Sequence, residues 1–170
     1  MRTLPRHQGE ASMQDDKIIA ALNELIETSK DGEKELTRAA EDAREPDLAR
    51  AFSDAEEANR TASAELQDQV RLLGGTAEQE GSLKAAARRS WTSVKAMVSS
   101  RDDNAIMEEC ERCQSHVRGR YADALELELP EPIRSVVERR HQAIVDSHYR
   151  LLDLRNRFRD TSARAIRASD

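Results

Sequence analysis

The chain is poor in aromatic residues, cysteine, proline and glycine. Phe, Trp and Tyr make up 3% of its 170 residues, and it has two cysteines, four prolines and six glycines. Because 35% of the residues are charged and Ala, Leu, Glu and Arg dominate, the composition favours long helices over a sheet. Two cysteines do not make a disulfide scaffold, so both thiols are expected to be reduced. The length suits one domain with a real core.

Several classes of protein are excluded by what the sequence does not contain. No apolar run approaches the roughly 20 residues that span a bilayer, and the start, MRTLPRHQGEASM, lacks the apolar core of a secretion signal. We therefore expect a cytoplasmic protein without a membrane partner. The net charge of -6 argues against nonspecific nucleic-acid binding. No Walker loop, nucleophile elbow or Gly-rich dinucleotide turn occurs, which favours a non-catalytic protein.

The few helix breakers are clustered, and the clusters mark the helix boundaries. Pro46 suits the first position of a helix, and Gly74 with Gly75 can end that helix. The stretch ELPEP predicts a tight corner later in the chain. One domain over 14–159 is expected, with helices at about 14–43, 46–73, 82–98, 103–129 and 132–158. Residues 1–13 are expected to be a flexible leader, with Met13 as an alternative start, and residues 160–170 a frayed tail.

The spacing of these helices predicts the topology. They form two helical hairpins joined by a connection of about 28 residues, whereas a direct turn needs only about 2 to 8. A connection of that length suits a crossover along the bundle. The predicted fold is all-α: a ferritin-like four-helix bundle with a long crossover that contains an extra short helix. An up-down-up-down bundle with a lateral helix is the competing topology.

The predicted interior contains a few polar side chains that could bind metal. Ferritin-like di-iron sites use inward-facing Glu and Glu-x-x-His residues. On helical wheels, the corresponding positions here are Glu33, Glu56, Gln114, His141 and His148, with Asn59 nearby. Two carboxylates are few for two metals, so the alternative is a hydrogen-bonded polar layer or a polar rim. No cofactor is expected beyond iron, manganese or zinc at these positions.

The stretch ECERCQSH brings sulfur, carboxylate and imidazole groups together. Cys110 and Cys113 are three residues apart in the middle of a predicted helix, so both are expected to face the core as small apolar side chains. His116 projects to another side. A redox pair would sit at a helix N-terminus after a strand, and a zinc site would need a second ligand pair. Helix packing is therefore the expected role of the cysteines.

The end of the chain is rich in arginine and predicts a surface for contacts. The arginines are Arg134, Arg139, Arg140, Arg150, Arg155, Arg157, Arg159, Arg164 and Arg167. Such a stripe can bind an acidic partner or phosphate, or pair with acidic helices of the same bundle or of a second subunit. Without interleaved aromatic residues, nucleic-acid binding is not favoured. We expect a homo-oligomer, a dimer, or a protein partner on the helical faces, with Trp91 sealing the crossover or anchoring a dimer.

Residues 17–155 resemble a bacterial family of ferritin-like four-helix-bundle proteins whose domain has no known function. The stretches that carry the resemblance are LNELIETSKDGEKELTRAAEDA, AELQDQVRLLGGTAEQEGSLKAAARRSW, IMEECER, YADALELELP and HYRLLDLR. The resemblance implies the crossover topology and a structural, stress-associated or interaction role. Where the family often has Gly-Glu, this chain has Cys113 and Gln114, so a carboxylate that could complete a metal site is replaced by an amide.

Overall fold

The computed structural model describes residues 7–81 and 103–167, with side chains described over 13–81 and 103–158. These residues form four helices and no strand, which confirms the all-helical prediction. The helices are α1 (His7–Asp42), α2 (Pro46–Leu72), α4 (Asp103–Leu125) and α5 (Glu131–Arg167). The short helix predicted at 82–98, with Trp91, falls outside the described residues. None of the helices described here is both long and apolar enough to cross a membrane.

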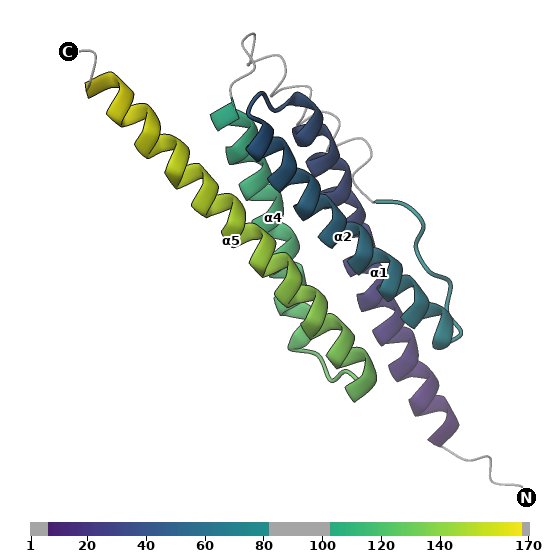
Figure 1. Ribbon diagram of the computed structural model, residues 1–170. Coiled ribbons are helices and arrows are strands. Elements are labelled where there is room, and N and C mark those ends of the chain that lie inside the picture. The colour runs from purple at the N-terminus through teal and green to yellow at the C-terminus, as the bar shows by residue number, and fades with distance from the viewer. Residues whose placement is uncertain (1–6, 82–102, 168–170) are drawn as a thin grey trace, which may run out of the picture.

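The four helices form a bundle in which each helix packs against two others. α1 and α5 lie at diagonally opposite corners, and each contacts both α2 and α4 (Figure 1). Asp103, the first residue of α4, accepts hydrogen bonds from the backbone N–H groups of Arg44 at 3.0 Å and Glu45 at 3.2 Å. α4 therefore begins beside the corner where α2 begins, and the two helices run in the same direction. The connection between them has its ends at opposite ends of the bundle, as a crossover requires.

The beginning of this connection turns back along α1. Gly74 takes a positive φ of 76°, the conformation that glycine adopts readily at a helix end. The side chain of Asn23 on α1 then accepts a 2.8 Å hydrogen bond from the backbone N–H of Glu78. Further on, Gly81 lies so close to Asp31 that an added Cβ would be 1.9 Å from the carboxylate. The described part of the connection is thereby attached to one side of α1.

The core consists of two apolar clusters, one toward each end of the bundle. The first, near the α4–α5 turn, includes Ile18, Leu22, Leu25, Ile26, Ala62, Leu66, Val70, Val117, Tyr121, Ile133, Val137 and Ile144. The second, near the α1–α2 corner, includes Leu36, Ala39, Leu48, Phe52, Ala55, Ile106, Met107, Cys110 and Leu151. On every helix a stretch of the buried face separates the two clusters, and this stretch holds the polar side chains of the candidate site.

The outer helices are longer than the sequence pattern predicts. α1 begins at His7 rather than at residue 14, and α5 continues to Arg167 instead of ending at residue 158. Both added segments lack proline and contain mainly good helix formers, so nothing in them stops the helix. α4 ends at Leu125 rather than at 129, and an end there agrees with Pro130, whose ring would clash with the carbonyl four residues earlier if the helix continued. The ends of α1 and α5 project from opposite ends of the bundle (Figure 1).

Candidate functional site

A layer of buried polar side chains crosses the bundle at mid-height. We define this mid-bundle polar layer by one or two residues from each helix, all at most 4% exposed: Ser29 on α1, Asn59 on α2, Gln114 on α4, and Ser147 and His148 on α5. Each lies, along its helix, between residues of the two apolar clusters. The layer is therefore enclosed above and below by hydrocarbon.

Some polar groups of the layer are satisfied by protein atoms. Ser29 and Tyr121 share a hydrogen bond of 2.8 Å between their hydroxyl oxygens, which joins α1 to α4. Asn59 donates to the backbone carbonyl of Ala55 at 3.0 Å, and Ser147 donates to a carbonyl one turn earlier at 2.9 Å. Two of these three bonds stay within one helix, so the layer contains few polar links between helices.

Other groups of the layer have no hydrogen-bond partner among the described protein atoms. They are Oδ1 of Asn59, both polar atoms of the Gln114 amide and Nδ1 of His148. Nε2 of His141, which is on α5 outside the layer, also has no such partner. An unsatisfied buried polar group costs about 1–3 kcal/mol. Because Gln114 presents both a donor and an acceptor, a group that satisfies it must both accept and donate a hydrogen bond.

The surroundings of the two histidines of α5 favour the neutral form by lowering their pKa. Burial lowers the pKa of His148, and the positive charge of nearby Arg118 lowers it further. The same two causes lower the pKa of His141, whose ring stacks on Tyr121 with a centroid distance of 6.4 Å. A neutral imidazole can accept a hydrogen bond or bind a metal, whereas an imidazolium can do neither.

The five predicted metal ligands differ in how deeply they are buried. Gln114 and His148 are buried in the mid-bundle polar layer, and His141 is half-buried beside Tyr121. Glu33 and Glu56 are half-buried on α1 and α2. Over the described residues, no three His, Cys, Asp or Glu side chains lie close enough together to hold a metal ion. The carboxylates are thus not gathered around the imidazoles.

A second polar cluster, between α1 and α4, was missed by the sequence analysis. A groove of about 160 Å³ is lined there by Thr28, Asp31, Glu35, Glu109, Arg112, Cys113, His116 and Val117. On the helical wheel Glu35 points away from the apolar face, yet its carboxylate is hydrogen-bonded to the thiol of Cys113. A spacing of four residues places two side chains on the same side of a helix. Asp31 and Glu35 on α1 have this spacing, as do Glu109 and Cys113 on α4, and this could have indicated that each helix carries a polar stripe.

Both cysteines are free, and their surroundings disfavour the thiolate form. Cys110 is 1% exposed and Cys113 is half-buried. Burial is the main cause that raises the pKa of each thiol, and the negative charge of Glu35 raises it further. Because the thiolate is the nucleophile and the metal ligand, a raised pKa suppresses both reactions. The location of Cys110 in an apolar cluster agrees with the packing role predicted for it.

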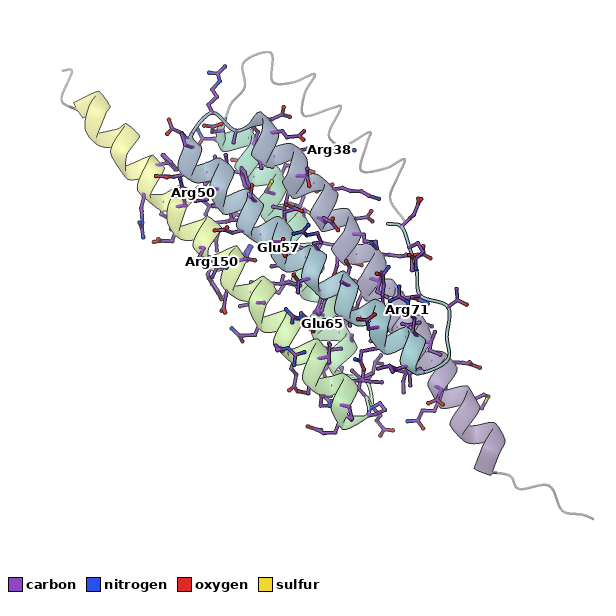
Figure 2. The ribbon with its side chains drawn as sticks, turned by 45° about the vertical axis from the view of Figure 1, so that its right-hand side comes forward. Arg38, Arg50, Glu57, Glu65, Arg71 and Arg150 are labelled. Atoms are coloured by element: carbon purple, nitrogen blue, oxygen red, sulfur yellow. The ribbon has the colours of Figure 1, made fainter. Side chains whose placement is uncertain are left out.

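Part of the arginine stripe is paired inside the bundle. Arg140 donates to Glu65 on α2 at 2.7 Å, and Arg139 donates to the same carboxylate at 2.9 Å. Figure 2 shows Glu65 on the side of α2 that faces α5. These bonds, above all the one from Arg140, lower the pKa of Glu65. Arg155 pairs in the same way with Glu111 on α4. These arginines therefore attach α5 to both neighbouring helices.

Comparison with known proteins identifies the family and gives no activity. No curated protein matches the chain. The match to a family spans α1 from Lys17 onward, α2, the connection and α4, and it stops before α5. Since residues 17–127, well over half of the chain, match the domain of unknown function DUF2383, the chain belongs to that family.

Proposed function

We propose that this protein is a non-catalytic, ferritin-like helical bundle that works through contacts made by its projecting helix ends. The crossover topology supports the ferritin-like assignment. Among structural, stress-associated and interaction roles, the lengths of the helices favour interaction. α1 and α5 have 36 and 37 residues, whereas α2 and α4 have 27 and 23. The additional turns extend beyond the helices that form the core (Figure 1).

The observation that carries this proposal is the opposite charge of the two projecting ends. Asp15 and Asp16 are exposed near the start of α1, and acidic residues of the α4–α5 turn lie at the same end of the bundle. At the other end, residues 150–167 contain six arginines and two aspartates. Opposite charges at opposite ends suit binding to partners, since complementary charge steers encounter and selects orientation.

Site-specific crosslinking tests this proposal on the full chain. A photo-crosslinking residue is placed at Met13 on the projecting part of α1, at Asn156 on that of α5, and at Ala64 in the middle of α2 as the control. All three positions are exposed. After illumination of cells of the natural host, we expect adducts from Met13 and Asn156 and none from Ala64. Equal labelling at the three positions would refute the proposal.

A bound divalent metal in the mid-bundle polar layer is the second candidate. The favouring observation is that the His148 imidazole and the Gln114 amide are both buried and both contain polar atoms without a protein hydrogen-bond partner. In this proposal His148, His141 and Gln114 would hold iron, manganese or zinc, and Glu33 and Glu56 would supply negative charge. The amide of Gln114 offers one neutral oxygen and no negative charge, which makes it a weaker ligand than a carboxylate and ranks this candidate below the first.

Elemental analysis tests the metal proposal. Protein purified without chelator is compared with the variants Glu33→Ala and His141→Ala, and the proposal expects stoichiometric metal that both variants lose. The variant Gln114→Glu replaces the amide by the acidic residue that the resembling family has, so it should tighten Zn²⁺ binding by about tenfold or more, because affinity rises with ligand charge. Wild-type protein without metal, together with no gain in Gln114→Glu, would rule the site out.

A further inference from the structure

The projecting end of α1 carries a groove with exposed apolar side chains. The groove has a volume of about 380 Å³ and is lined by Met13, Gln14, Lys17, Ile18, Leu127 and Glu128. Met13 is 62% exposed and Leu127 is 46% exposed, and both are among the large hydrophobic residues left uncovered in the described part of the chain. The exposed charged residues near them are mainly acidic: Asp15 and Asp16 on α1 and Glu126, Glu128 and Glu131 near the α4–α5 turn, against one base, Lys17.

The projecting end of α5 has the complementary character. Leu154 and Phe158 pack against the second apolar cluster and are half-buried, so part of each side chain remains accessible. The residues around them are mainly basic: Arg157 is exposed and pairs with Asp153, and Arg159, Arg164 and Arg167 follow further along the same helix. Arg155 is already paired with Glu111 of its own bundle. An apolar, acidic end and an apolar, basic end therefore occur on one molecule.

We propose that the α1 groove binds the projecting end of α5 from a second copy of this chain. This inference rests on the proposed function and names the partner of the two ends. Charge selects this pairing among the alternatives: two α1 ends would bring acidic groups together, and two α5 ends would bring arginines together. Only the unlike pairing combines opposite charges and covers apolar side chains on both ends.

The directions of the helices make the contact geometrically simple. α1 and α5 run in the same direction and project from opposite ends of the bundle (Figure 1). A second copy displaced along the bundle axis therefore brings its α1 end toward the α5 end of the first. The two contacting surfaces are different, so each copy keeps one free end of each kind. Such a contact is heterologous, and it builds an open chain or a closed ring rather than a two-fold dimer.

Sedimentation velocity of charge-reversal variants tests the pairing. In one variant the charges of two acidic residues are reversed, by Asp15→Lys with Asp16→Lys. In the other variant the charges of two arginines are reversed, by Arg157→Glu with Arg164→Glu. The control is Asp54→Lys, an exposed change in the middle of α2. The full-length proteins are compared from about 1 μM to about 1 mM, at about 0.05 M and about 0.5 M salt.

The wild-type chain and the control should form species larger than dimers that grow with concentration and shrink at high salt. Each pair of charge reversals removes most of the charge difference between the two ends, so association should weaken by about tenfold or more. In a mixture of the two variants, the unchanged α5 end of one variant can bind the unchanged α1 groove of the other, and association should return in the form of mixed pairs.

Two results overturn the inference: a wild-type chain that is monomeric at every concentration, and assembly that neither reversal changes. The crosslinking experiment separates this failure from that of the proposed function. Adducts of Met13 and Asn156 with other proteins, from a chain that is monomeric in solution, leave the proposed function intact and refute self-association. Monomeric protein without end-specific adducts refutes both.

Discussion

Replacement of Gln114 by methionine is expected to stabilise the protein. The side chain is 0% exposed, and neither its amide nitrogen nor its amide oxygen has a hydrogen-bond partner among the described protein atoms. Each unsatisfied group costs about 1–3 kcal/mol when buried. Methionine keeps the unbranched shape of glutamine and removes both polar atoms. The two groups together cost about 2–6 kcal/mol. We expect the free energy of unfolding to rise by about 1–3 kcal/mol, less than that sum, because methionine does not fit the site perfectly.

Urea denaturation followed by circular dichroism measures this change. The midpoint should rise while the slope of the free energy against urea concentration stays constant, since the surface exposed on unfolding is unchanged. Gln142→Met on the exposed face of α5 is the matched control and should change the stability by less than about 0.5 kcal/mol. The experiment is repeated with and without a chelator.

A loss of stability of 1 kcal/mol or more in Gln114→Met would refute this reasoning. It would mean that the amide is satisfied in solution by a group that the mid-bundle polar layer binds. If the loss disappears when the wild type is also treated with chelator, that group is a metal ion. If the loss persists, the group is water or an organic ligand. The measurement thus distinguishes the ways in which the layer could be satisfied.

Three further predictions concern the polar groups of the bundle. The pKa of buried His148 is lowered from its usual 6.5, so the unfolded chain takes up a proton more readily than the folded protein does. Stability should therefore fall as the pH drops below about 6.5, and denaturation between about pH 7.5 and about 5.5 should show this loss. The variant His148→Gln should lose less stability over the same range. Tyr121→Phe should lower the free energy of unfolding by about 1–2 kcal/mol by removing its bond to Ser29, and adding Ser29→Ala should restore part of the loss in a double-mutant cycle. Glu65→Gln should lower the free energy of unfolding by roughly 0.5–1 kcal/mol, because the ion pairs of Glu65 are only partly shielded from solvent. Glu57→Gln breaks an exposed ion pair within α2 and should leave the free energy of unfolding almost unchanged in the same assay.

The helices and the path of the chain were largely predictable from the sequence. The apolar residues recur at helical spacing, and the breakers are clustered, so both short corners and the long connection could be located. Pro46 begins α2 as predicted, and Gly74 ends it in the left-handed conformation. Length alone predicted a connection that traverses the bundle, and the bonds of Asp103 to the α1–α2 corner agree with this prediction.

The polar groups between helices were harder to predict, because a helical wheel describes one helix at a time. It indicated correctly that Gln114 is buried, but it assigned Glu35 to the side away from the core. The position of Glu35 depends on how closely α4 approaches α1, and small residues such as Gly32 influence that approach. An added Cβ at Gly32 would be 3.1 Å from Cγ2 of Val117 on α4. Contacts of this kind follow from the packing of two helices and have no periodic signal in either sequence.

The mid-bundle polar layer gives the core an alignment that hydrocarbon alone would leave weakly specified. If one helix slid by a turn relative to its neighbours, Asn59 or Gln114 would move into one of the two apolar clusters, and an apolar residue would enter the layer. A helix in a uniformly apolar core can slide at lower cost, because one aliphatic side chain replaces another. A polar residue in a helical core can therefore fix the alignment of helices while it lowers stability, as a buried Asn does in coiled coils. By this argument, the stability gained in Gln114→Met should come with a less uniquely packed bundle, visible as broader side-chain NMR signals than those of the wild type.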